Sequence, residues 1–157
     1  MTETCIAADA DATRAWGARL ANALLRPEVV PVSLVITLEG DLGAGKTTFV
    51  SGLLAALGHD GPVRSPTYTL IEPYRLAGRD IQHCDLYRLR TADELDDLGW
   101  RDLPAPGAIL LIEWPDKAGD RLGPVDLAVM FAYEGTDARR ISFGARSKVG
   151  QVLVDAL

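Results

Sequence analysis

The sequence contains few cysteines, few aromatic residues and no long hydrophobic run. Its two cysteines are Cys5 and Cys84, so no disulfide framework is expected, and no histidine and cysteine set has the spacing of a zinc site. No stretch approaches the roughly 20 consecutive apolar residues that a membrane-spanning helix needs. The first residues also lack the basic start and apolar run of a signal peptide. We therefore expect a cytoplasmic protein with reduced thiols and no membrane segment.

Basic side chains are in the minority. The chain has 16 Lys and Arg residues against 22 Asp and Glu residues, which gives a formal net charge of −6. This balance disfavours a general electrostatic grip on a nucleic-acid backbone, so any connection with RNA would run through a partner. The 157 residues are 48% hydrophobic and 24% charged, which is typical of a globular chain of one-domain length. We expect residues 1–157 to form a single domain.

Segments of helical and strand-like pattern alternate along the chain. Apolar residues at helical spacing predict a helix over residues 9–25, with Asp9 or Asp11 as its N-cap. A second helix is expected from the glycine-rich segment to Gly58. Short apolar runs predict buried strands at residues 34–38, 81–86 and 109–112.

Three further segments complete the predicted fold. Residues 60–69 contain prolines and a glycine and are expected to form a loop. Thr91 with Glu94 three residues later predicts a short capped helix. Alternating apolar residues on both sides of Gly135 predict a C-terminal antiparallel hairpin. Together these elements indicate a three-layer α/β fold, with a mixed, mainly parallel sheet flanked by helices and ending in that hairpin.

The clearest motif is a glycine-rich loop that matches G-x-x-x-x-G-K-[ST] in full, between a predicted strand and a predicted helix. Its glycines let consecutive backbone N–H groups point at a phosphate, and the following helix offers its positive N-terminal end. The residues expected to hold the nucleotide phosphates are Gly40, Asp41, Leu42, Gly43, Ala44, Gly45, Lys46, Thr47 and Thr48. The motif makes the predicted fold P-loop NTPase-like.

The loop also predicts a magnesium site. Lys46 would place its charge between the β- and γ-phosphates, and the Thr47 hydroxyl would bind Mg²⁺. A triphosphate-bound Mg²⁺ usually needs a carboxylate at the end of a neighbouring buried strand. Glu113 follows the apolar run at 109–112, and Asp85 closes a weaker strand. On pattern alone, either acid fits this role.

The nucleotide base is identified by elimination. GTPases read guanine with an Asn-Lys-x-Asp motif, but the only asparagine is Asn22, which precedes alanine. Asp96 to Gly99 match the D-x-x-G pattern of GTPase switches, but they follow a helix instead of a strand, so we interpret the match as chance. Adenine is therefore the expected base, and ATP or ADP the expected ligand.

Five segments together carry a resemblance to a known family. They are residues 40–49 (GDLGAGKTTF), 63–70 (VRSPTYTL), 83–89 (HCDLYRL), 94–102 (ELDDLGWRD) and 111–115 (LIEWP). In their order and spacing the chain resembles the TsaE family, bacterial ATPases that assist formation of N6-threonylcarbamoyladenosine (t6A) in tRNAs. The P-loop alone is shared by many families, whereas the second, third and fifth segments are specific.

The resemblance implies ATP hydrolysis in a complex with the proteins TsaD and TsaB. TsaD would perform the transfer to tRNA, so this chain would meet tRNA only indirectly. By position, Thr47 and Glu113 match the magnesium ligands, and Asp85 matches the acid needed for hydrolysis. Trp114 and Arg139 match positions that contact the nucleotide.

The remaining motif residues carry weaker expectations. Ser65, Pro66 and Thr67 would act as a switch near the γ-phosphate, and His59 would approach the nucleotide. His83 is expected to be a packed histidine that at most orients Asp85. The arginines at positions 75, 79, 88, 90 and 101 are expected to be solvent-exposed and to form a rim on the surface.

Two features bear on partners and rival functions. Ser51 stands where family members often carry an arginine, and Trp100 where they usually carry an aliphatic residue. These two departures affect the expected details of the surface that contacts partners, and leave the expected nucleotide binding unchanged. No arginine finger or glutamine is visible, so hydrolysis is expected to be slow until a partner completes the site. The rivals are a small-molecule P-loop kinase, for whose lid and acceptor pocket the chain has little room, and a module that senses ATP without hydrolysing it.

Overall fold

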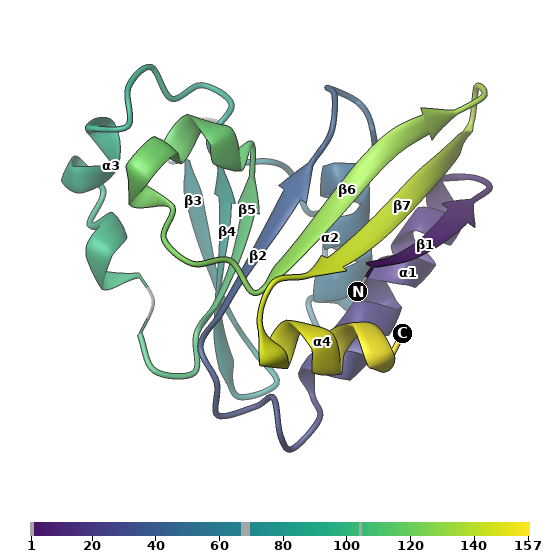
Figure 1. The fold of residues 1–157 in the computed structure, drawn as a ribbon, viewed down its shortest axis with the longest axis horizontal. Coiled ribbons are helices and arrows are strands. Elements are labelled where there is room, and N and C mark those ends of the chain that lie inside the picture. Colours follow the sequence, from purple (N-terminus) through teal and green to yellow (C-terminus); the bar gives the residue numbers. More distant parts are fainter. Residues whose placement is uncertain (1, 67–69, 104) are drawn as a thin grey trace.

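The computed structural model describes residues 2–66, 70–103 and 105–157, which form one seven-stranded sheet with helices packed against it (Figure 1). The strands are β1 (Thr2–Ala7), β2 (Leu34–Glu39), β3 (Ile71–Leu76), β4 (Arg79–Asp85), β5 (Ile109–Glu113), β6 (Leu127–Glu134) and β7 (Ala138–Ala145). The helical segments are α1 (Ala10–Leu24), α2 (Lys46–Ala56), α3 (Glu94–Asp97), α4 (Lys148–Asp155) and the 3-10 segments η1 (Trp100–Asp102) and η2 (Pro115–Arg121).

The sheet is mixed, with the strand order β1-β7-β6-β2-β5-β4-β3. β6, β2, β5 and β4 run parallel in its centre, whereas β3 pairs antiparallel with β4, and β7 with both β1 and β6. The predicted mixed α/β fold and its hairpin are therefore confirmed. The register places Leu38 of β2 and Asp85 of β4 opposite Glu113 of β5. The carboxyl ends of three strands thus meet at one edge, where open α/β sheets bind ligands.

Apolar side chains form a core on each face of the sheet. Because side chains alternate between the faces of a strand, Ile109 and Leu111 join a larger core with α1, α2 and α4, whereas Leu110 and Ile112 join a smaller one with α3, η1 and η2. All residues of β5 are buried, as is typical of a parallel strand covered on both faces. The helix layers on the two faces account for the predicted three-layer arrangement.

Helices α1 and α2 approach each other closely at two glycines. A Cβ added to Gly17 of α1 would lie 2.1 Å from the carbonyl oxygen of Phe49 in α2, and one on Gly52 of α2 would lie 2.1 Å from the carbonyl oxygen of Arg14 in α1. Asp9 caps α1 and accepts the Ala12 N–H at 2.8 Å. Because α2 begins at the glycine-rich loop, this crossing fixes the loop relative to α1.

Arg79 does not belong to the expected solvated rim of arginines. Its side chain is 3% exposed, and its guanidinium donates to the carbonyl oxygens of Leu24, Val32 and Gly107 at 2.8 to 3.2 Å. Burial lowers its pKa. The side chain therefore connects the end of α1 to the loops before β2 and β5. These contacts lie at the amino ends of the central strands, opposite the carboxyl ends that form the site.

Several elements differ from the sequence-based expectations. β1, β3, η1, η2 and α4 were not predicted, and β1 and β3 are edge strands in which only Ala7 of β1 is buried. The helix predicted after Thr91 is only the four residues of α3, where the Glu94 carboxylate accepts the Thr91 N–H at 3.1 Å. The expected loop is irregular over residues 60–66, and its last part, 67–69, lies outside the described residues. Among the described helices, none is long and apolar enough to cross a membrane.

We predict that Gly17→Ala destabilises the fold. At an unobstructed position in a helix, this change would stabilise by about 1 kcal/mol. Here the added methyl group would push α1 from α2, so the free energy of unfolding, measured by urea denaturation, should fall by about 2 kcal/mol. In the control Gly144→Ala, the nearest atom to the added methyl is Met130 Cε at 3.7 Å, and stability should change by less than about 0.5 kcal/mol. A Gly17→Ala protein as stable as the wild type would contradict this packing.

Candidate nucleotide-binding site

The glycine-rich loop connects β2 to α2 in a conformation that only glycine adopts easily. Gly45 has a φ of 107°, in the left-handed region. A Cβ on Gly40 would lie 2.6 Å from the Phe131 carbonyl oxygen. Among the described residues no side chain caps the N-terminus of α2, so its first N–H groups are available to an anion.

Lys46 is held beside this loop. Its side chain is 5% exposed, and its Nζ donates to the carbonyl oxygens of Gly40 and, at 3.0 Å, Asp41. Nζ also lies 4.2 Å from the centre of the Trp114 ring, within cation–π range. Burial lowers the pKa of Lys46, and the negative charge of Glu113 opposes this shift. The ammonium group is therefore fixed at the positive end of α2.

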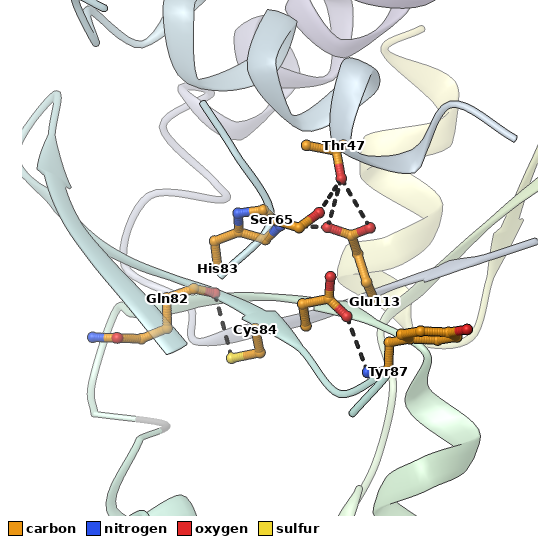
Figure 2. Close-up of polar contacts among 8 residues, drawn as sticks. Thr47, Ser65, Gln82, His83, Cys84, Tyr87 and Glu113 are labelled. Carbon is orange, nitrogen blue, oxygen red and sulfur yellow. Dashed lines mark hydrogen bonds and ion pairs between the residues drawn. The ribbon is translucent and has the colours of Figure 1, made fainter. Parts of the chain in front are cut away.

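Four oxygen-bearing side chains converge next to Lys46. Thr47 Oγ1 contacts the Ser65 hydroxyl and lies 3.2 and 3.3 Å from the two carboxylate oxygens of Glu113. The Ser65 hydroxyl also donates a hydrogen bond to Asp85. Figure 2 shows Thr47, Ser65 and Glu113 directed at one another. Both acids that the sequence pattern left open therefore reach the same place.

His83 contacts Glu113. Its Nε2 lies 2.6 Å from Glu113 Oε2, and both side chains are buried (Figure 2). His83 was expected at most to orient Asp85, but the carboxylate that its imidazole contacts is that of Glu113. The reason is the register of β4 and β5, which pairs His83 with Leu111 and leaves Glu113 diagonally within reach of the imidazole.

Asp85 lies in an environment that favours its protonated form. Its burial raises its pKa, and the nearby charge of Glu113 raises it further. Hydrogen bonds from the Tyr87 backbone N–H, at 3.0 Å, and from the Ser65 hydroxyl act in the opposite direction. A buried carboxyl with raised proton affinity is typical of groups that handle protons in catalysis.

Trp114 follows Glu113 in a backbone conformation that is rare for a bulky residue. Its φ of 59° and ψ of 53° lie in the left-handed region, which costs about 1–3 kcal/mol and persists where surrounding contacts impose it. Its ring contacts Lys46 and packs against Tyr87 with 5.0 Å between ring centres. The indole therefore forms a wall beside the beginning of α2.

A cavity of about 420 Å³ contains these groups. It is lined by the glycine-rich loop and by Ser65, Pro66, Asp85, Tyr87, Arg88, Glu113 and Trp114. Arg88 is exposed, as expected of the solvated rim, and it also borders this cavity. No local pattern indicates this second feature, because it depends on where the turn after β4 lies in the fold.

A second cavity, of about 480 Å³, lies on the other side of the loop, whose residues Gly43, Gly45 and Thr48 border both. Arg139 of β7, which the family resemblance places near the nucleotide, lines it. Its Nε is buried and has no hydrogen-bond partner among the described residues, which is uncommon for a buried donor.

Three residues of this second cavity were missed by the sequence analysis. They are Asp9, which was expected only as an N-cap, and Thr13 and Asp137. Asp9 and Thr13 lie where α1 begins, and Asp137 lies in the turn of the β6–β7 hairpin. No sequence motif marks them, because only the tertiary fold brings α1 and this hairpin to the same side of the loop.

The residues present fit a magnesium-bound nucleotide. The end of α2 and Lys46 suit phosphates, and the Thr47 hydroxyl and Glu113 carboxylate are oxygen ligands of the kind that Mg²⁺ prefers. Within residues 2–66, 70–103 and 105–157, no three His, Cys, Asp or Glu side chains gather to hold a metal by themselves. Mg²⁺ that arrives with phosphates needs only one or two carboxylates from the protein.

His59 was expected to approach the nucleotide, but it packs elsewhere. The ring of His59 packs against Tyr74 with 5.0 Å between ring centres. His59 follows the C-terminal end of α2, whereas the loop precedes its N-terminal end, and a helix of this length spans roughly 16 Å. Thr67 lies outside the described residues, so the proposed switch is represented here by Ser65 and Pro66.

The loop, its position after a buried parallel strand and the carboxylate on the adjacent strand define a P-loop protein of the α/β class. The family model described as Threonylcarbamoyl adenosine biosynthesis protein TsaE matches residues 7–141. The chain belongs to the TsaE family.

Individual relatives agree with this assignment. The tRNA threonylcarbamoyladenosine biosynthesis protein TsaE of Haemophilus influenzae is 42% identical over 141 residues, which cover 90% of this chain and 88% of that protein. The protein of the same name from Bacillus subtilis is 37% identical over 123 residues, 78% of this chain and 77% of that protein. The crystal structure of Bacillus subtilis YdiB is similar with a TM-score of 0.76 and 30% identity, covering 99% of this chain and 93% of that one.

We predict that Asp85→Asn stabilises the nucleotide-free protein. Because the folded-state pKa of Asp85 is raised, the native state binds more protons than the unfolded chain above the ordinary carboxyl pKa, and stability falls as pH rises through this window. Asp85→Asn removes this loss, so the free energy of unfolding at pH 7 should rise by roughly 1 kcal/mol, and the gain should shrink toward pH 4.

The matched control is Asp80→Asn, at the exposed second residue of the same strand, where the carboxylate pairs with Arg75 at 2.9 Å. This control should give no gain at pH 7. Denaturant unfolding of both variants between pH 4 and pH 8 makes the test. If Asp85→Asn gives no gain in the free energy of unfolding, or the same gain at every pH, then the ionised Asp85 carboxylate does not destabilise the folded protein.

Proposed function

We propose that this protein binds ATP with Mg²⁺, hydrolyses it slowly, and acts in the biosynthesis of t6A in tRNA. The observation that carries the proposal is the meeting of Thr47, Glu113 and Asp85 beside the uncapped N-terminus of α2. A phosphate-binding loop alone would suit many ligands. A hydroxyl and two acids at its rim suit a triphosphate with a magnesium ion and an attacking water.

Each residue has a role that follows from its position. The first N–H groups of α2 and the Lys46 ammonium stabilise negative charge on the β- and γ-phosphates. Thr47 and Glu113 hold the ion, which when bound neutralises charge that develops on the phosphate oxygens. Asp85, whose raised pKa suits proton transfer, orients the attacking water and polarises it. Arg139 offers its Nε, which has no partner within the described part of the chain, to the nucleoside end of the ligand.

A role in tRNA modification is supported by the names of the relatives in Haemophilus influenzae and Bacillus subtilis. The net charge of −6 disfavours direct binding of tRNA through its backbone. We therefore propose that the protein acts through a complex, with TsaD and TsaB as the partners that the family resemblance implies. Arg88 provides one cation at the cavity, and a partner is proposed to complete the arrangement for fast turnover.

Two rival functions remain distinguishable by experiment. A small-molecule kinase would transfer the γ-phosphate to an acceptor, and phosphate would not be released to water. An ATP sensor would bind nucleotide and release no phosphate, alone or with partners. The raised pKa and burial of Asp85 favour hydrolysis over sensing, because binding alone gains nothing from a buried acid that repels phosphate.

We predict that Lys46→Ala loses tight nucleotide binding. The variant removes a buried cation whose hydrogen bonds to phosphate oxygens should contribute about 2–3 kcal/mol, so the Kd for Mg·ADP should rise roughly 100-fold. Isothermal titration calorimetry measures this change. Lys117→Ala, at an exposed lysine of η2, is the matched control and should bind like the wild type. Unchanged affinity in Lys46→Ala would refute the proposed phosphate site.

We predict that Asp85→Ala binds ATP but does not hydrolyse it. Loss of the group that polarises water should lower phosphate release by about 100-fold or more, while the Kd stays within a few-fold of the wild type. Phosphate release is measured without partners and with TsaD and TsaB, using Asp80→Ala as the control. Full activity of Asp85→Ala would remove Asp85 from the mechanism, and a wild type that releases no phosphate in either condition would favour the sensor.

A further inference from the structure

His83 is a buried polar residue that has no role in the proposed binding and hydrolysis of ATP. Its side chain is 0% exposed and lies on the face of β4 that α2 covers, where Ile81 contributes an apolar side chain to the core. Its Nδ1 is buried without a hydrogen-bond partner among the described residues. A buried nitrogen of this kind costs free energy that an apolar side chain would avoid. Packing alone therefore does not explain a histidine at this position.

The other nitrogen of the ring makes a short contact with Glu113. Nε2 lies 2.6 Å from Oε2 of that carboxylate. An ionised carboxylate only accepts hydrogen bonds, so Nε2 carries the hydrogen and donates it. The imidazole sits on the strand next to Glu113 and is enclosed by the core, so this donor has a fixed position.

This contact distinguishes the two oxygens of Glu113. The last torsion of a glutamate side chain has a broad energy minimum, so an isolated carboxylate would rotate. Both oxygens lie near the Thr47 hydroxyl, Oε1 at 3.2 Å and Oε2 at 3.3 Å, but His83 contacts Oε2. This contact therefore fixes the carboxylate through Oε2 and leaves Oε1 beside Thr47 without a contact to His83.

We propose that His83 is a positioning residue that orients Glu113 for Mg²⁺. Donors behind a metal-binding carboxylate fix its orientation, and their loss typically weakens metal binding by 10- to 100-fold. The inference rests on the proposed function, because it assumes a nucleotide-bound Mg²⁺ at Thr47 and Glu113. His83 itself touches neither the metal nor the nucleotide.

The test measures how nucleotide affinity depends on Mg²⁺, without recourse to hydrolysis. The Kd for ADP is determined by calorimetry in EDTA and over a series of Mg²⁺ concentrations, for wild type, His83→Leu, His83→Asn and His83→Gln. The Gln side chain can place its amide N–H at the position of imidazole Nε2, whereas the shorter Asn side chain cannot reach Glu113. The control is His59→Leu, which alters the other histidine, packed on Tyr74 away from the site.

For His83→Leu and His83→Asn we expect the Mg²⁺ concentration that gives half of the affinity gain to rise about tenfold. Their Kd for ADP in EDTA should equal that of the wild type. His83→Gln should restore the wild-type Mg²⁺ dependence to within about threefold, and His59→Leu should leave it unchanged. His83→Asn keeps the comparison informative if the leucine variant folds poorly.

The outcomes separate this inference from the proposed function. If the wild type binds ADP more tightly with Mg²⁺ and the leucine and asparagine variants show the same Mg²⁺ dependence, the positioning role is refuted and the proposed function stands. The positioning role is also refuted if affinity in EDTA falls as much as affinity in Mg²⁺, since that result indicates a purely structural role. A wild type that binds no nucleotide under any condition refutes both.

Discussion

Parallel pairing of β5 with both β2 and β4 is the constraint on which this site depends. It aligns the ends of the three strands, so that the glycine-rich loop leaving β2, Glu113 at the end of β5 and Asp85 at the end of β4 meet at one edge. The N-terminus of α2 closes the same space. Two close glycine contacts pack α2 against α1. At the amino ends of the central strands, buried Arg79 connects α1 to the loops before β2 and β5. These contacts therefore set the position of α2 relative to the strand ends where the phosphates would bind.

The site concentrates features that cost stability in the absence of a ligand. Burial raises the pKa of Asp85, and the charge of the nearby Glu113 carboxylate raises it further. The backbone of Trp114 is in an unfavourable conformation, and Arg139 has an unpaired buried nitrogen among the residues that the structure describes. Folded proteins tolerate such local costs mainly where function requires them. All three features border the cavities around the glycine-rich loop, and each would be relieved or used when a magnesium nucleotide binds.

The parts of this arrangement that are encoded locally could be predicted from the sequence. The glycine-rich loop is a contiguous motif, and β5 is a uniformly apolar run, so both can be recognised from their own residues. The partners of His83 and the position of Arg88 depend on strand register and on a turn, which no local pattern reveals. Arg79 and the edge strands β1 and β3 were missed for a related reason, because their environments are made by segments distant in the sequence. The pattern alone also left open which acid lies next to Thr47; the topology brings Glu113 to Thr47 and Asp85 to Ser65.

The most direct test of the central claim is a crystal structure of the protein with Mg²⁺ and a non-hydrolysable ATP analogue. We expect the β- and γ-phosphates at the N-terminus of α2 beside Lys46, and the nucleoside in the cavity lined by Arg139. An ion should lie about 2.0–2.1 Å from its oxygen ligands, in contact with Thr47 and next to Glu113. An empty loop in crystals grown with excess ligand, or phosphates bound elsewhere, would contradict a nucleotide site at the ends of β2, β4 and β5.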